Sequence, residues 1–162
     1  MKKLINIWNI PNYPLTETFG KFETNFKNYN QTLSIDKKSL LVQLKNKLPS
    51  KKLYAKNNYF YKTNSSSIKK KDLNKFINFT IKNINRNKVK KIIDVGSNDL
   101  TVIKKFGSKK RKLIAIDPNL SEKKNSKITF IRKYIEELNF SKVFKNVDLV
   151  ICRHTLEHIR NP

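Results

Sequence analysis

The stretch "KKIIDVGSNDL", residues 90–100, is a short apolar segment followed by an acid, one glycine and a polar turn. Ligands of parallel sheets bind at the carboxyl ends of the strands, where a glycine lets the backbone turn sharply. We therefore interpret residues 92–95 as a strand and the polar residues after it as a candidate cofactor-binding turn. A helix is expected near Thr101 to Phe106, with its free amide groups directed at that turn.

The segments on either side of this stretch alternate between helical and strand-like patterns. Apolar residues between Leu73 and Ile84 recur at helical spacing. Three more short apolar runs, at residues 111–117, 127–131 and 147–152, read as strands, and "YIEELNF", residues 134–140, reads as a short helix. Helices that alternate with strands predict an α/β fold, with about four parallel strands and helices on both faces of the sheet.

The N-terminal part has a different pattern. Residues 1–50 read as a small irregular unit that contains turn and loop at residues 10–22 and a hairpin at residues 31–44. Residues 51–67 read as a connecting loop, and residues 68–162 as the α/β domain. No internal repeat is apparent.

The chain is strongly basic. Its 162 residues include 36 Lys and Arg against 12 Asp and Glu, which gives a net charge of +24. Such a charge suits a nucleic-acid partner, although lysines scattered along the whole chain also fit a general compositional bias. Because no zinc finger or helix-turn-helix pattern is visible, we expect only non-specific, salt-sensitive binding to nucleic acid.

Cysteine usage and hydropathy favour a cytoplasmic protein. The single cysteine, Cys152, allows no intrachain disulfide. The N-terminal apolar stretch is interrupted by Asn6 and Asn9 and followed by Pro11, which argues against a signal peptide. No run approaches the roughly 20 apolar residues that a membrane helix needs, so no membrane partner is expected.

The composition of the turn restricts the cofactor. A dinucleotide fingerprint needs three glycines and a P-loop needs Gly-Lys-Ser/Thr, whereas this turn has only Gly96. Asp117 ends the second strand, where its carboxylate can accept hydrogen bonds from ribose hydroxyls. An adenosine cofactor without phosphates, S-adenosylmethionine (SAM), fits both features. In the alternative interpretation, Asp94 and Asp117 only cap turns.

A polar cluster follows the fourth strand, in "VDLVICRHTLEHIRNP". Arg153, His154, Glu157 and His158 are expected over the cofactor turn, and the two histidines would share one face if the segment is helical. Two histidines do not make a metal site. The alternative is a solvated helix start.

The stretches "DVGSNDL", "IAIDPN" and "DLVICRHTLEHI" resemble the class I SAM-dependent methyltransferases, and more narrowly the nucleotide-sugar C-methyltransferases of deoxysugar pathways. Upstream, "YFYKTNSS", residues 59–66, is similar to a Tyr-x-Tyr element of that family. The resemblance implies a Rossmann-like methyltransferase sheet and a base at His158, with His154, Glu157 and Tyr61 assisting it. It implies cofactor contacts from Asp94, Gly96, Ser97, Asn98, Asp99, Asp117 and Arg153.

Three departures from the family matter. The resemblance implies a zinc ribbon at the N-terminus, but Asp36 and Ser39 stand where thiolates would be needed, so no zinc is expected. Leu100 replaces the last glycine of the first motif and is expected to crowd the methionine end of the cofactor. The family's sheet has seven strands, so the chain reads as its N-terminal part.

Two functional interpretations follow from these features. The first is a SAM-dependent methyltransferase-like protein acting on a carbon of a nucleotide-linked sugar or related small molecule, with inactivity as a partial chain left open. The alternative is a non-catalytic basic protein that binds nucleic acid or a partner protein.

Overall fold

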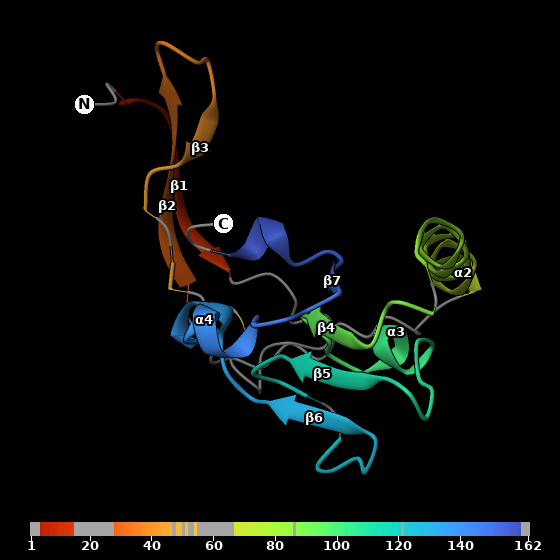
Figure 1. Ribbon diagram of the computed structural model, residues 1–162. Helices are drawn as coiled ribbons and strands as arrows, with labels where there is room; N and C mark the ends of the chain where they lie inside the picture. Colours follow the sequence, from red (N-terminus) through yellow and green to blue (C-terminus); the bar gives the residue numbers. More distant parts are fainter. Residues whose placement is uncertain are drawn as a thin grey trace. The chain divides into compact units, whose positions relative to one another are not determined.

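The computed structural model describes residues 4–14, 28–46, 48–49, 51, 54, 67–85, 87–120 and 122–159. The chain divides into two compact units, a first unit of Met1–Tyr61 and a second unit of Lys62–Pro162. Figure 1 labels their helices and strands. The second unit contains the "DVGSND" turn, residues 94–99.

The first unit is an antiparallel sheet of three strands in the order β1-β2-β3. These strands are β1 (Leu4–Pro14), β2 (Asn28–Asp36) and β3 (Val42–Leu44). The hairpin predicted at residues 31–44 is confirmed, since Leu33 pairs with Leu44 across it. The sequence predicted turn and loop from residue 10, and this prediction is wrong for residues 10–14. These residues belong to β1, which includes Pro11 and Pro14 and has a register shift between Ile10 and Tyr13.

The second unit contains a parallel sheet of four strands in the order β6-β5-β4-β7. They are β4 (Lys91–Val95), β5 (Lys112–Ile116), β6 (Ile128–Ile131) and β7 (Leu149–Cys152). The predicted α/β fold with four parallel strands is thus confirmed. The chain adds strands on one side of β4 and then returns to its other side, so the topological switch point lies between β4 and β7.

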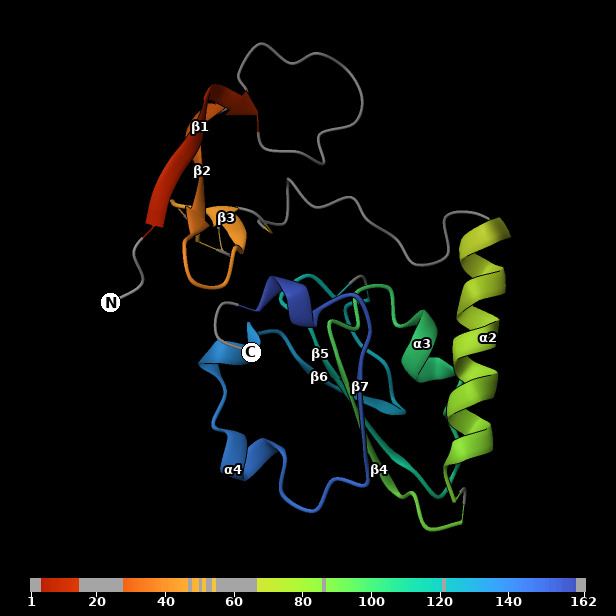
Figure 2. The ribbon, with the colours of Figure 1, turned by 90° about the horizontal axis from the view of Figure 1, so that it is seen from above.

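Helices cover both faces of this sheet. On one face lie α2 (Ser67–Asn83) and α3 (Thr101–Lys104), and on the other α4 (Phe140–Val143), as Figure 2 shows. Residues of β4 alternate between the two cores: Ile92 packs with α2 and α3, and Ile93 with the α4 side. The helical stripe predicted between Leu73 and Ile84 faces the first core.

The helix predicted at residues 134–140 is not continuous. A 3₁₀ turn, η1 (Ile135–Glu137), is followed by its C-cap residue Leu138, and α4 starts directly after Asn139. The Asn139 side chain caps α4 by accepting a hydrogen bond from the Lys142 amide at 3.1 Å. Asparagine therefore begins a new helix where the apolar spacing predicted a single one.

Within the described residues, no helix has the length and apolar character required to cross a membrane.

Candidate functional site

The β4 turn, residues 96–100, joins β4 to α3 at the switch point. Three of its residues have positive φ: Gly96 at 76°, Asn98 at 43° and Leu100 at 60°. The turn is closed by a hydrogen bond from the Leu100 amide to the Ser97 carbonyl at 2.7 Å. The Gly96 amide donates to the Ile116 carbonyl of β5 at 2.8 Å. The sharp glycine turn expected from the sequence is present.

Asp117 joins this turn to the end of β5. One carboxylate oxygen, Oδ2, accepts a hydrogen bond from the Asn98 amide at 3.0 Å, and Oδ1 accepts one from the Asn119 amide at 2.6 Å. Burial raises the pKa of Asp117, while the two amide hydrogen bonds oppose the rise. Asp117 therefore holds two turns in place, and each oxygen retains a second lone pair for a ligand hydroxyl.

Asp94 lies at the end of β4 with only 2 % of its surface exposed. Its Oδ2 atom has no hydrogen-bond partner among the described residues. Burial raises the pKa of Asp94 to about 7, and the carboxylates of Asp117 and Asp99 add to the rise. The Ser97 hydroxyl and the Ile103 amide oppose it. A buried acid with an unpartnered oxygen is costly unless something outside the fold pairs with it.

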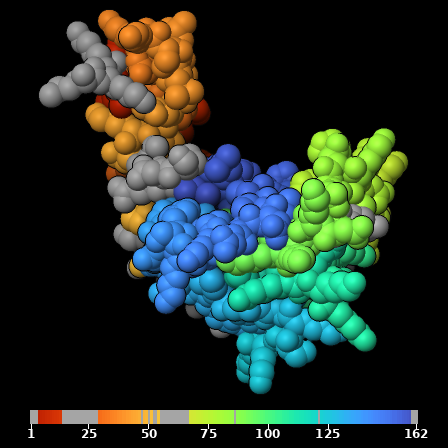
Figure 3. Space-filling view, viewed as in Figure 1, coloured from red at the N-terminus to blue at the C-terminus, as the bar shows by residue number. Residues whose placement is uncertain are grey.

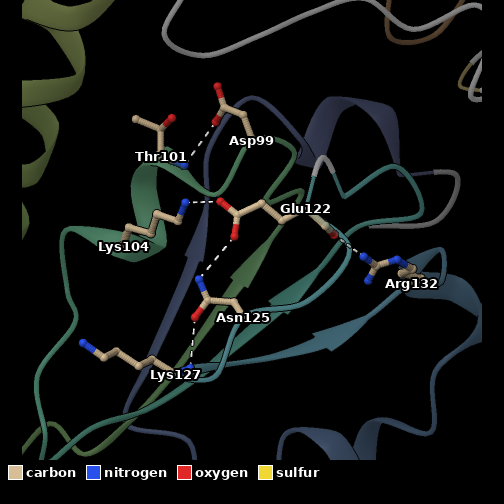
Figure 4. A network of polar contacts seen from close by, with 7 residues as sticks. All are labelled: Asp99, Thr101, Lys104, Glu122, Asn125, Lys127 and Arg132. Atoms are coloured by element: carbon tan, nitrogen blue, oxygen red, sulfur yellow. Dashed lines mark hydrogen bonds and ion pairs between the residues drawn. The ribbon is translucent and has the colours of Figure 1, made fainter.

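Ser97 and Asp99 organise the start of α3. The Ser97 hydroxyl donates to the backbone carbonyl of Asp94 at 2.6 Å. The Asp99 carboxylate accepts a hydrogen bond from the Thr101 amide at 3.1 Å, as Figure 4 shows. Both side chains thus support the turn through local contacts.

Gly96 makes its closest approach to another loop. A Cβ atom built on Gly96 would lie 2.0 Å from the Thr155 hydroxyl, which comes from the segment after β7. The turns at the ends of β4 and β7 are therefore packed directly together at the switch point. Sequence reasoning missed Thr155, since nothing in its local pattern indicates a contact 59 positions away from Gly96.

The Leu100 side chain, which was expected to point at the methionine end of a cofactor, lies in the core. It is fully buried in the core cluster that contains Ile103 and Phe106. Its backbone is left-handed, with φ 60°, and its side chain packs into the core.

We expect Leu100→Gly to destabilise the protein by roughly 1–3 kcal/mol, because the lost core packing exceeds the relieved left-handed strain. Leu100→Ala should be less stable still, since it loses most of the packing and keeps the strain. Urea denaturation of both variants measures the difference. A Leu100→Gly variant more stable than the wild type would show that strain dominates.

The segment after β7 brings two histidines to one carboxylate. The Glu157 Oε1 atom lies 4.0 Å from His154 Nδ1 and 4.0 Å from His158 Nε2. The prediction that the two histidines share one helical face is wrong. Only Leu156–His158 forms a 3₁₀ turn, η2, and His154 precedes this turn with φ 51°. All three side chains are well exposed to solvent.

Arg153 and Tyr61 complete the predicted residues. The Arg153 guanidinium lies 6.0 Å from the centre of the Phe76 ring on α2. Arg153 is thus directed along the α2 face of the sheet, where cation–π attraction favours it. Tyr61 lies outside the described residues.

A polar network ties the loop between β5 and β6 to α3 (Figure 4). Glu122 pairs with Lys104 and accepts a hydrogen bond from the Asn125 amide group at 3.2 Å. Asn125 in turn accepts from the Lys127 backbone amide at 3.0 Å. This network stabilises the loop between β5 and β6, whose described residues form no helix.

No metal-binding group is found in the part of the chain that the structure describes: it contains no cluster of three or more His, Cys, Asp or Glu side chains suited to a metal ion. At the hairpin where the resemblance implies thiolates, Asp36 accepts a hydrogen bond from the Lys38 amide at 2.9 Å. Ser39 accepts one from the Leu41 amide at 3.4 Å. These oxygens stabilise the hairpin turn.

Comparison with known proteins gives no family assignment. Neither a scan against protein-family models nor a search of curated proteins found a match to this chain.

Proposed function

We propose that the second unit binds SAM at the β4 turn and that the chain is a SAM-dependent methyltransferase-like protein with a Rossmann-like sheet. The observation that carries the proposal is the buried Asp94 carboxylate at the switch point, with one oxygen unpartnered among the described residues. A buried acid with one unpartnered oxygen at the carboxyl ends of parallel strands is typical of a ligand site.

The groups around the turn match the chemistry of SAM. The cofactor has an ammonium group, which suits the unpartnered oxygen of Asp94. It has two ribose hydroxyls, which suit the remaining lone pairs of Asp117. It has no phosphate, in agreement with a turn that contains a single glycine.

When bound, SAM supplies an electrophilic methyl group on a sulfonium. For a carbon nucleophile beside a ketone, the chain must remove a proton and hold the acceptor in line. We assign the removal of this proton to His158, acting as the base. Glu157 can orient either histidine through the 4.0 Å contacts of its Oε1 atom. His154, Arg153 and Tyr61 remain candidates for acceptor binding. The acceptor class, a nucleotide-linked sugar or related small molecule, rests on the resemblance alone.

Calorimetry with SAM and its demethylated product tests the proposal, with two aspartates as a matched pair. Asp117 and Asp148 each accept two backbone amide hydrogen bonds, at opposite ends of the same sheet. Asp117→Asn should weaken SAM binding by roughly 1–3 kcal/mol, because a charged acceptor is lost at the site. Asp148→Asn should leave the affinity for SAM unchanged.

Two outcomes would reject the proposal. The first is the absence of saturable heat with the wild-type chain. The second is an equal loss of affinity in both variants, which would report a general loss of stability rather than the loss of a cofactor contact.

A further inference from the structure

The amino ends of the four parallel strands form an edge rich in lysine. Lys91 pairs in register with Lys112, and Leu113 with Ile128, so Lys127 lies beside Lys112. In Figure 1 the arrows of β4, β5 and β6 point the same way, which brings the loops before them to one side. Neighbouring strands are about 4.8 Å apart, so Lys91 and Lys112 at the starts of β4 and β5, and Lys127 just before β6, are closely spaced.

Seven exposed lysines from the loops and strand starts at this edge make up what we call the amino-edge cluster. Two further cations at the edge are engaged with carbonyl groups: Lys91 Nζ donates to Val143 at 3.0 Å, and Arg111 Nη1 donates to Phe106 at 3.1 Å. These bonds hold the loops that present the cluster. Its members are Lys88, Lys90, Lys109, Lys110, Lys112, Lys127 and Lys145.

The side chains of this cluster extend outward. Figure 4 shows the Lys127 ammonium pointing away from the network around Glu122. Figure 3 shows long side chains protruding from the teal and cyan segments, which include the loops before β5 and β6. Among the described residues, Lys109, Lys110, Lys112, Lys127 and Lys145 form no salt bridge.

Acidic residues of the second unit are segregated away from this edge. Among the described residues of the second unit, the acid closest in sequence to a strand start is Asp148, whose carboxylate accepts the Lys90 and Lys91 amides at 2.9 and 2.7 Å. Glu122, in the loop before β6, is paired with Lys104. The other acids lie in α2, at the end of β4, or in segments that follow strand ends: Asp72, Asp94, Asp99, Asp117, Glu122, Glu136, Glu137 and Glu157. If lysine were only frequent throughout the chain, positive and negative side chains would not be concentrated at opposite ends of the parallel strands.

We propose that the amino-edge cluster binds the phosphodiester backbone of nucleic acid. A row of mobile ammonium groups attracts a linear polyanion through counterion release. The loops before the four strands contain two aromatic residues, and neither ring is free for a base: Phe106 is buried in the core, and Phe144 packs against the second core and stacks on Phe140. Binding is therefore independent of sequence.

The composition of the edge disfavours a membrane partner. Most apolar residues of these loops and strand starts are buried in the core, among them Val89, Phe106, Leu113 and Ile128, and the partly buried Phe144, Val147 and Leu149 pack against it. The edge therefore presents little apolar surface for insertion between lipids. The cluster lies at the end of the sheet opposite the β4 turn. Its binding therefore does not depend on the proposed cofactor site.

Two variants of equal charge test this assignment. In the edge variant, Lys109, Lys112, Lys127 and Lys145 become Gln. In the control variant, the same change is made at four exposed lysines outside the cluster: Lys70, Lys71, Lys75 and Lys133. The probes are short duplex DNA and single-stranded RNA, each in two unrelated sequences, and vesicles with and without phosphatidylserine. Fluorescence anisotropy and vesicle co-sedimentation over a series of salt concentrations give the affinities, with thermal unfolding as the check on folding.

We expect the edge variant to lose at least about tenfold in affinity for every nucleic acid and the control variant clearly less. The slope of log affinity against log salt should fall by roughly one for each phosphate contact removed in the edge variant. Equal losses in the two variants would overturn the proposal by showing that only net charge matters. Edge-dependent binding to anionic vesicles without binding to nucleic acid would also overturn it.

Discussion

Gly96→Ala is expected to destabilise the second unit strongly, and more than the same change at the unit's other glycine, Gly107. The new Cβ would lie 2.0 Å from the Thr155 hydroxyl and 2.8 Å from its methyl group. The residue would also keep φ at 76°, a left-handed conformation that disfavours alanine. Overpacking and strain together should cost roughly 2–5 kcal/mol of unfolding free energy, measured by urea denaturation.

Gly107→Ala is the matched control for this prediction. A Cβ there would lie 3.2 Å from the Lys104 carbonyl and 3.9 Å from a Leu113 methyl group, and Gly107 has no left-handed φ. Its stability should stay close to that of the wild type. Adding Thr155→Gly to Gly96→Ala should restore part of the loss. Equal stability of the two alanine variants would contradict the packing of the β4 turn against the segment after β7.

The stability of the protein should fall as the pH rises from about 4 to about 7. Burial raises the pKa of Asp94 from 3.8 to about 7, so the folded state binds a proton that the unfolded state has released over this interval. The stabilisation is fully present below pH 3.8 and is lost as the pH passes through about 7. A shift of this size corresponds to roughly 4 kcal/mol at most. Asp117, whose pKa burial also raises, acts in the same direction.

Asp94→Asn should flatten this profile and increase stability at neutral pH, because the amide cannot ionise in the buried site. Urea denaturation at a series of pH values measures both effects. The control is Asp148→Asn, which removes an exposed carboxylate whose pKa is lowered by amide hydrogen bonds from Lys91 and Lys90. Its contribution has the opposite sign, since it is lost as the pH falls through the lowered pKa. An unchanged slope in Asp94→Asn would show that Asp94 is not the group responsible.

Local patterns in the sequence were sufficient to predict most elements of the second unit. Helical spacing predicted α2, and short apolar runs predicted all four parallel strands. The predictions of secondary structure failed where a single residue interrupts the pattern of the neighbouring residues. Asn139 begins a new helix inside an apparent one, and β1 accommodates Pro11 with a register shift and ends at Pro14.

The candidate site was predictable in its residue types and not in its contacts. Acid, glycine and position after a strand indicated the β4 turn. Its packing on Thr155 and the amide hydrogen bonds that occupy Asp117 depend on residues brought together only by the sheet. Leu100 was misplaced because its side chain, on a left-handed backbone, packs into the core. The amino-edge cluster is likewise invisible in the sequence, where its lysines are spread over 58 positions.

Backbone-amide NMR during titration of the wild-type chain with SAM tests the central claim most directly. Saturable shift changes are expected at Gly96 to Asp99, at Asp117 and Asn119 and in the segment after β7, with none at Lys109 to Lys112 on the opposite edge. A titration without saturable changes at Gly96 and Asp117, or with changes confined to the lysine edge, would contradict a SAM site at the β4 turn.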